Sequence, residues 1–211
     1  MSGLATLLTL ADSRLPVGGH VHSGGVEEAV TRGLVTDLTT LRAFLTRRIR
    51  TSGLVTASVA AAVHSGTLST HRGDLETDAR TPSPAARVAS RAQGRGLVRL
   101  ARRVWPHADW EPVGVTPHLA VAAGVVGVAG GLAPEQTALS IVYTTMTGSA
   151  TAAQRLLALD PGDVAALTFD LSPLCEVTAA AAARELADLS DPLLDVLAQR
   201  HADRERPLFA S

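Results

Sequence analysis

Lysine is absent from this sequence, and all 19 basic residues are arginine. The absence excludes a Walker A phosphate loop, which needs a lysine on the nucleotide phosphates, and it excludes catalysis through a lysine Schiff base. The single cysteine, Cys175, excludes an intramolecular disulfide and a CxxC metal site. Aromatic residues make up only 3% of the chain, so its core must be built mainly from alanine, valine and leucine. Such a core is typical of close-packed helices.

The charge balance and the apolar runs exclude further classes. A net charge of −1 gives no support for a nucleic-acid or membrane-surface binder. The first residues lack the basic and apolar regions of a signal peptide, so we expect a cytoplasmic protein. Only residues 119–132 approach a membrane-like run, but this run is about 14 residues, is broken by glycines, and falls short of the roughly 20 that a spanning helix needs. It predicts a buried core helix.

Apolar residues recur every three or four positions through most of the chain, which indicates amphipathic helices. Asp37, Ser83 before Pro84, and Asp191 before Pro192 are strong helix-start signals. We therefore predict an all-α fold, a single-domain helical bundle of about eight to ten helices over residues 1–211, with 201–211 as a C-terminal tail. The predicted helices cover residues 4–10, 26–33, 36–64 with a bend at Gly53, a short stretch within 66–84, 84–105, 119–132, 134–159, 163–169, 174–186, and a last one from 191.

The segment from Leu10 to Glu27 is rich in proline and glycine and separates two apolar stretches. Loops of this kind on rigid scaffolds often carry function. Its Gly19 to Gly24 spacing matches the glycines of a phosphate loop, but the two residues that follow are Gly25 and Val26 instead of lysine and a hydroxyl residue. Ser23 lacks the preceding glycine of a hydrolase nucleophile motif, because position 21 is valine. Neither an NTPase nor a serine hydrolase is indicated.

Two histidines in the same segment, His20 and His22, form a conceivable half-site for a nickel or zinc ion. A stable metal site needs further ligands, and the sequence has no HExxH motif and no cysteine–histidine cluster. We therefore interpret both as loop histidines that form hydrogen bonds or contact a partner. Nickel binding by these two side chains remains the alternative.

Arginines recur every fourth residue along the helix predicted for residues 84–105 and form one ridge on its surface. Like charges at this spacing repel each other by a few tenths of a kcal/mol per pair, so helix stability does not explain the ridge. Two interpretations stay open: a solvated face paired with acidic residues such as Glu76 and Asp78, or contact with an acidic partner surface or nucleotide phosphates.

The C-terminal tail ends with two adjacent apolar residues, Leu208 and Phe209, in a charged stretch. Termini usually fray. Two large apolar side chains on such a tail favour docking, either on this chain or on another one.

The run LADSRLPVGGHVHSGGVEEAV closely resembles the N-terminal signature of the urease accessory protein UreF family. The resemblance extends to RAQGRGLVRL at residues 91–100, to LAPEQTAL followed by a small-residue helix and QRLLAL, and to PLLDVLAQRH and PLFAS near the C-terminus. It covers essentially the whole chain. The family is all-helical, in agreement with the pattern of the sequence.

This resemblance implies a non-catalytic scaffold in the insertion of nickel into urease. Members of the family bind the accessory protein UreD, called UreH in some organisms, form homodimers and recruit the GTPase UreG. The complex docks on apo-urease, and the nickel and the nucleotide belong mainly to these partners, so the resemblance implies no cofactor for this chain.

We expect the loop to be a partner-contact surface toward UreG or UreD, with Glu27 as its exposed charge, and the tail to dock on UreD. The predicted partner-binding residues are Asp12, Ser13, Leu15, Pro16, Gly18, Gly19, His22, Ser23, Gly24, Glu27, Arg91, Arg95, Leu208 and Phe209.

Overall fold

The computed structural model describes residues 3–12, 15, 23–188, 191–204 and 208–209. Helices make up 75% of the described residues, and these residues contain no strand, so the all-α prediction is confirmed. In chain order the elements are α1 (Leu4–Leu10), α2 (Val26–Thr31), α3 (Leu38–Arg48), the π-helical turn η2 (Ile49–Gly53), α4 (Leu54–His64), α5 (Thr70–Arg80), α6 (Pro84–Val104), the 3-10 turn η3 (Glu111–Val113), α7 (Leu119–Ala129), α8 (Pro134–Leu157), α9 (Pro161–Arg184) and α10 (Pro192–Ala202).

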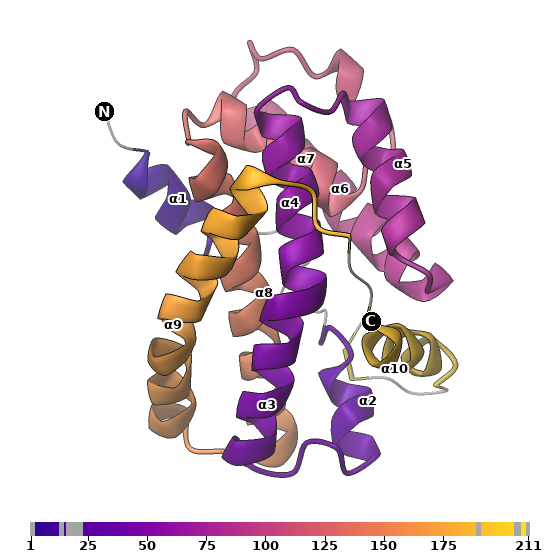
Figure 1. Ribbon diagram of the computed structural model, residues 1–211, viewed down its shortest axis with the longest axis vertical. Helices are drawn as coiled ribbons and strands as arrows, with labels where there is room; N and C mark the ends of the chain where they lie inside the picture. The colour runs from indigo at the N-terminus through magenta and orange to yellow at the C-terminus, as the bar shows by residue number, and fades with distance from the viewer. Residues whose placement is uncertain (1–2, 13–14, 16–22, 189–190, 205–207, 210–211) are drawn as a thin grey trace.

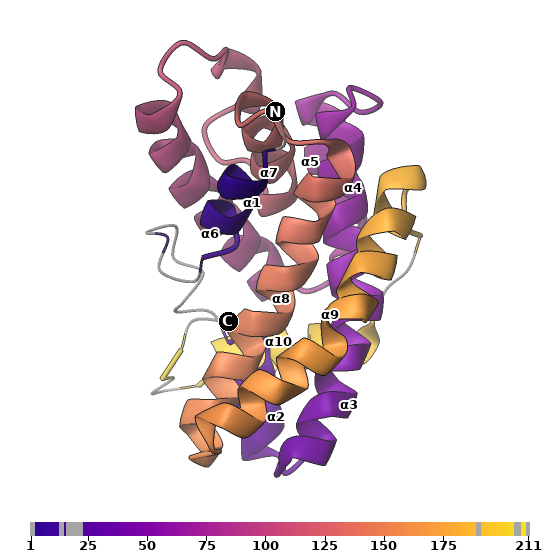
Figure 2. The ribbon, with the colours of Figure 1, turned by 90° about the vertical axis from the view of Figure 1, so that its left-hand side faces the viewer.

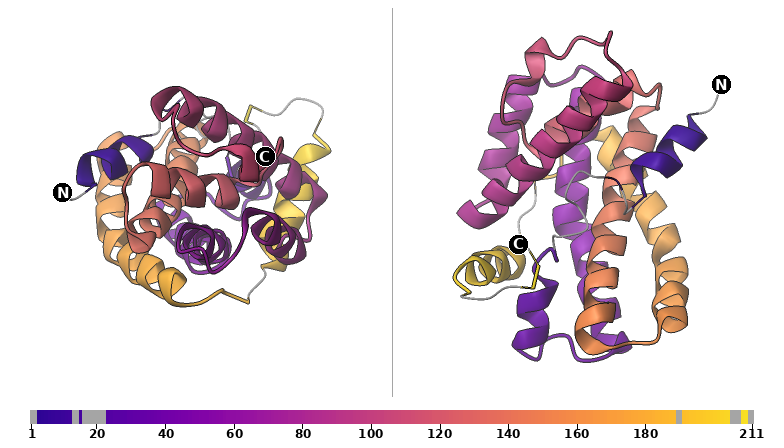
Figure 3. Two further views of the ribbon diagram at one scale, coloured as in Figure 1. Left: turned by 90° about the horizontal axis from the view of Figure 1, so that it is seen from above. Right: turned by 180° about the vertical axis from the view of Figure 1, so that it is seen from behind.

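Helix α4 lies at the centre of the molecule, where it packs against α7, α8 and α9 (Figure 1). The helices α3 and α4 follow each other as one rod, with α8 and α9 running beside it (Figure 2). Helices α5, α6 and α7 cover one end of this rod, while α2 and α10 lie together nearer the other end (Figure 3). The buried apolar residues form one core cluster made largely of alanine, valine and leucine, as the scarcity of aromatics predicted.

Three predicted helix starts are confirmed. The Asp37 carboxylate accepts the Thr40 N–H at 2.8 Å at the start of α3, and Ser83 Oγ accepts the Ala86 N–H at 3.2 Å at the start of α6. Asp191 accepts the N–H groups of the first turn of α10. Each side chain satisfies a backbone donor that has no partner within its helix.

Two details of the helix predictions differ from the structure. The bend predicted at Gly53 is a π-helical turn, η2, that joins α3 to α4. The two helices predicted for residues 163–169 and 174–186 are one helix, α9, with Pro173 inside it. Pro173 is exposed, whereas Leu171 and Cys175 on either side of it are buried, so packing keeps the helix continuous although proline removes a backbone hydrogen bond.

Helix α9 is also the one described helix that is long and apolar enough to cross a membrane by length and composition. Core helices pass the same test, and the inner face of α9 packs against α8 and α4. The run 119–132, which the sequence analysis singled out, forms the shorter helix α7. Its residues Ala120 to Gly124 are buried, as predicted.

Candidate functional site

The glycine-rich segment enters α2 through a tight turn at Gly24 and Gly25. Their φ angles are +61° and +85°, in the left-handed region that other residues rarely adopt. A Cβ atom at Gly24 would also lie 2.6 Å from the guanidinium carbon of Arg48. Both glycines are therefore required by the backbone. The other residues predicted from this loop, Ser13, Pro16, Gly18, Gly19, His20 and His22, lie outside the described residues.

Glu27, in the first turn of α2, is buried, with 2% of its surface exposed. Its carboxylate accepts hydrogen bonds from His201 Nε2 at 2.8 Å, from the Leu208 N–H at 2.9 Å and from the Phe209 N–H at 3.0 Å. The prediction that Glu27 is an exposed charge is wrong. The reason is that α2 packs against α10, which turns this side of the first helical turn toward the interior.

The surroundings of Glu27 favour its ionised form. Burial raises the pKa of this carboxyl group, but the hydrogen bonds from Leu208, His201 and Phe209 outweigh burial and hold the pKa below its ordinary value. The Arg204 guanidinium lies 3.9 Å from Glu27 and 3.2 Å from Glu28. Glu27 is therefore a carboxylate that holds helix α10 and the tail against α2.

The tail docks on its own chain and leaves one apolar side chain free. Phe209 is partly buried and packs against the core, whereas 78% of Leu208 is exposed. Of the two docking modes open from sequence, the structure shows docking on this chain for Phe209. The Leu208 side chain points to solvent although its backbone N–H is bound by Glu27.

The structure brings most of the described members of the predicted surface together. Ser23, Gly24 and Glu27 lie at the start of α2, next to the docked Leu208 and Phe209. Asp12, Leu15, Gly24 and Phe209 also line one common cavity. Arg91 and Arg95 lie elsewhere, on α6. The N-terminal signature and the C-terminal tail thus meet in one cluster, in which Ser23, Val26 and Glu27 are buried and Leu208 is exposed. We call this cluster the loop–tail surface and define it by residues 23–27 and 208–209.

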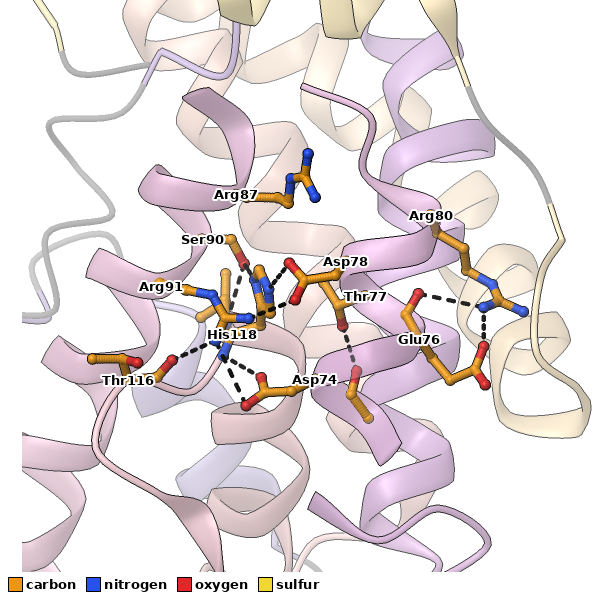
Figure 4. A network of polar contacts seen from close by, with 12 residues as sticks. Asp74, Glu76, Thr77, Asp78, Arg80, Arg87, Ser90, Arg91, Thr116 and His118 are labelled. Carbon is orange, nitrogen blue, oxygen red and sulfur yellow. Dashed lines mark hydrogen bonds and ion pairs between the residues drawn. The ribbon is translucent and has the colours of Figure 1, made fainter. Parts of the chain in front are cut away.

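The partly exposed Arg91 is bound by residues of its own chain (Figure 4). Its guanidinium donates to Asp78 at 2.8 Å and to the Thr116 carbonyl at 2.7 Å, and lies 3.7 Å from Asp74. The predicted pairing of the arginine ridge with Asp78 is confirmed for Arg91. In contrast, Arg95 is exposed and forms no ion pair within the described part of the chain.

Glu76, the other acidic residue that the sequence paired with the ridge, lies on α5 and binds arginines of its own helix instead. Its carboxylate contacts Arg72 at 2.9 Å and also contacts Arg80. The spacing of four residues on one helix brings these charges together, so Glu76 has no carboxylate oxygen directed at α6.

His118 is buried beside Arg91, between two helices. Its Nδ1 lies 3.0 Å from Ser90 Oγ, and its Nε2 lies 2.9 Å from Asp78 Oδ1. Burial and the charge of Arg91 lower the pKa of His118 against the opposing effect of Asp78. Ser90 sits within helix α6, and its Oγ also accepts the Leu119 N–H at 3.2 Å, so the cluster fixes the start of α7 against α6.

The sequence analysis assigned no partner to His118 or to His201. His201 lies 174 residues from Glu27, and His118 lies 40 residues from Asp78. No local spacing signals either contact. Among the described residues no group of three or more histidine, cysteine, aspartate or glutamate side chains could hold a metal ion.

Fold and site together define an all-α protein in which the glycine-rich segment and the tail are tied to one helical scaffold. A model of the UreF family matches residues 35–172, which is more than half of the chain. The chain is 82% identical to the urease accessory protein UreF of Mycolicibacterium vanbaalenii and 76% identical to that of Mycobacterium sp. strain JLS, and each alignment covers 100% of both proteins. The corresponding protein of Mycobacterium tuberculosis is 68% identical over the same full length. The chain belongs to the UreF family of urease accessory proteins.

Proposed function

We propose that this chain acts in urease maturation as a non-catalytic scaffold that bridges UreD, or UreH, and the GTPase UreG during GTP-dependent nickel insertion. The names of its relatives support a role in urease maturation. In this proposal the chain works in the cytoplasm as a homodimer, docks with its partners on apo-urease, and holds no nickel of its own.

The observation that carries the proposal is the loop–tail surface. Two segments that resemble the family at opposite ends of the sequence meet at Glu27, which binds the backbone of Leu208 and Phe209. The bound backbone presents the Leu208 side chain to solvent. An exposed leucine on a positioned backbone can bury its apolar surface in a pocket of a partner, which contributes about 1.5–3 kcal/mol. We assign this surface to UreD.

A second contact surface lies on α6. Arg95, Arg99 and Arg103 are exposed, are spaced four residues apart, and form no ion pair within the ranges that the structure describes. Their mutual repulsion is relieved when an acidic surface binds them. We assign an acidic surface of a partner protein to this face, while Arg91 supports the face from within through its contacts with Asp74 and Asp78.

The substitution Leu208→Asp tests the assignment of the loop–tail surface. It removes the exposed apolar side chain but keeps the N–H that Glu27 binds, so the fold is expected to stay intact. We expect capture of UreD to fall at least about tenfold, because burial of a leucine side chain contributes about 1.5–3 kcal/mol and about 1.4 kcal/mol corresponds to a factor of ten. A matched control is Val115→Asp, because Val115 is 90% exposed and lies outside this surface. Unchanged capture by Leu208→Asp would refute the assignment.

A further inference from the structure

Arg48 ends helix α3 and directs its guanidinium against the turn that starts α2. Its Nη1 donates a hydrogen bond to the Gly24 carbonyl. Its Nε is buried and has no hydrogen-bond partner within the described chain. A buried donor without an acceptor costs free energy, so native structures rarely leave a buried donor without a hydrogen bond.

Asp191, the carboxylate whose charge acts on Arg48, is already paired with another arginine. Both carboxylate oxygens of Asp191 accept a hydrogen bond from Arg47: Oδ2 from Nε at 2.5 Å and Oδ1 from Nη2 at 2.9 Å. Burial lowers the pKa of Arg48 to about 10, with only the charge of Asp191 opposing it. Arg48 is therefore a partly buried cation that forms no ion pair with the residues that the structure describes.

A cavity of about 350 Å³ lies beside Arg48, a volume within the range of small-molecule sites. Its wall includes the hydroxyl residues Ser52, Thr145 and Ser149. It also includes two further arginines, Arg80 and Arg155, and three carboxylates, Asp12, Asp191 and Asp195. Ser52 and Ser149 donate to backbone carbonyls, whereas the Thr145 hydroxyl has no hydrogen bond to any described residue. The cavity therefore offers a guanidinium and a hydroxyl that can both donate to one bound group.

The local backbone is unusual at the same place. The π-helical turn η2 begins directly after Arg48, and such turns occur frequently at functional sites. The turn brings Gly53 close to Arg48, since a Cβ at Gly53 would lie 3.0 Å from the Arg48 carbonyl oxygen and 3.7 Å from Thr145. The other buried side-chain atom without a partner in the described chain, Ser23 Oγ, belongs to the residue before Gly24. The two buried side-chain atoms without a partner in the described chain, Ser23 Oγ and Arg48 Nε, thus lie at the turn that starts α2.

We propose that the cavity beside Arg48 binds a small oxyanion of the phosphate or carboxylate class, with the Arg48 guanidinium as its main partner and Thr145 as a hydroxyl donor. The planar guanidinium fits an oxyanion through two parallel N–H bonds. Binding there supplies an acceptor for Nε and neutralises a guanidinium that has no ion pair among the described residues. The bound anion braces the Gly24 turn, and through it the start of α2 and the Glu27 cluster.

The test is titration calorimetry of the full chain with inorganic phosphate and, separately, with acetate, at constant ionic strength maintained with sodium chloride. We expect saturable binding of at least one anion, and its identity distinguishes the phosphate from the carboxylate class. Calorimetry is preferred to melting curves, because phosphate stabilises most proteins by being excluded from their surface.

Variants locate the site. Arg48→Met is expected to weaken binding at least about tenfold, the loss that follows from removing a hydrogen bond to a charged group. The matched control is Arg50→Met, because Arg50 is exposed on the same turn. Thr145→Val keeps the shape of the side chain and should weaken binding severalfold, which preserves the test if Arg48→Met does not fold. The proposal is overturned if neither anion binds at millimolar concentration, if Arg48→Met and Thr145→Val bind as tightly as the unaltered chain, or if Arg50→Met loses binding equally.

Discussion

At the scale of single residues, Glu27 determines how the two ends of the chain meet. Its carboxylate accepts one hydrogen bond from a side chain of α10 and two from the backbone of the tail. Hydrogen bonds to an ionised acceptor are about twice as strong as those between neutral groups. The buried charge of Glu27 thus stabilises the contact between α2 and α10, and it orders the backbone of the tail that presents Leu208.

Replacing Glu27 by glutamine should lower the free energy of unfolding by about 1–3 kcal/mol, because a neutral oxygen accepts these bonds less strongly and leaves buried donors poorly paired. Denaturant unfolding measures the loss, and hydrogen exchange should show faster exchange of the Leu208 and Phe209 amides. Glu176→Gln is the control, since Glu176 is exposed. Amide exchange that stays slow in Glu27→Gln would contradict the role of this carboxylate.

The Glu27→Gln variant also tests how stability depends on pH. The pKa of Glu27 is lowered in the folded chain from its ordinary value of 4.5, so the stability it contributes is fully present above pH 4.5 and is lost as pH falls through the folded pKa. The difference in unfolding free energy between the unaltered chain and Glu27→Gln should therefore shrink in acid. A difference that stays constant down to the acid-unfolding range would count against this account.

At this site, the conformational role of the glycines could be predicted from the sequence, whereas the burial of Glu27 could not. Gly24 and Gly25 could be identified because only glycine readily adopts the turn they form. Glu27 was predicted to be exposed because the loop before it was interpreted as a partner-contact surface, and a glutamate in a first helical turn, where the helix dipole favours it, gives no sign of burial. The burial of Glu27 depends on His201 and the tail, which lie more than a hundred residues away and carry no local signal.

At the scale of elements, close backbone approach fixes how the helices cross. Gly94 of α6 faces the residues that begin α7, and a Cβ there would collide with the Pro117 carbonyl oxygen and lie 2.8 Å from the His118 carbonyl carbon. Gly124 of α7 meets the backbone of α4 in the same way, 2.7 Å from the Ala60 carbonyl oxygen. Periodicity predicted where most of these helices begin and end. The prediction failed at Pro173, because the burial of Leu171 and Cys175 outweighs the local effect of proline.

Gly94→Ala should therefore lower the free energy of unfolding by about 1–3 kcal/mol, since backbone atoms cannot move aside as a flexible side chain could. The matched control is Gly148→Ala in α8, where nothing lies within 4 Å of the added methyl group. This second substitution should be neutral or raise stability by up to about 1 kcal/mol, because alanine favours the helix. Equal effects of the two substitutions in denaturant unfolding would refute the steric argument.

At the scale of the whole molecule, two partly or fully buried histidines connect stability to pH. Burial lowers the pKa of His64, opposed by the backbone of Leu132, and burial with the charge of Arg91 lowers that of His118. Both groups bind protons less readily in the folded chain than in the unfolded chain. Their contribution to stability is complete above the ordinary value of 6.5 and is lost as pH falls through the folded values.

The free energy of unfolding should fall as pH drops from above 6.5 to about 5.5, by at most about 1.4 kcal/mol per pH unit for each histidine. Denaturant unfolding at several pH values measures this slope. His64→Gln should reduce the slope, whereas His71→Gln, at an exposed position, should leave it unchanged. A free energy that is constant over this range would contradict the predicted linkage.

The central claim is that the glycine-rich segment and the tail act together as one partner surface, and hydrogen exchange with and without bound UreD tests it most directly. The account predicts that UreD slows exchange of the amides of residues 23–27 and of Leu208 and Phe209 in the same complex, and that Leu208→Asp abolishes both effects. Protection that appears only outside these residues, or at one of the two segments without the other, would contradict it.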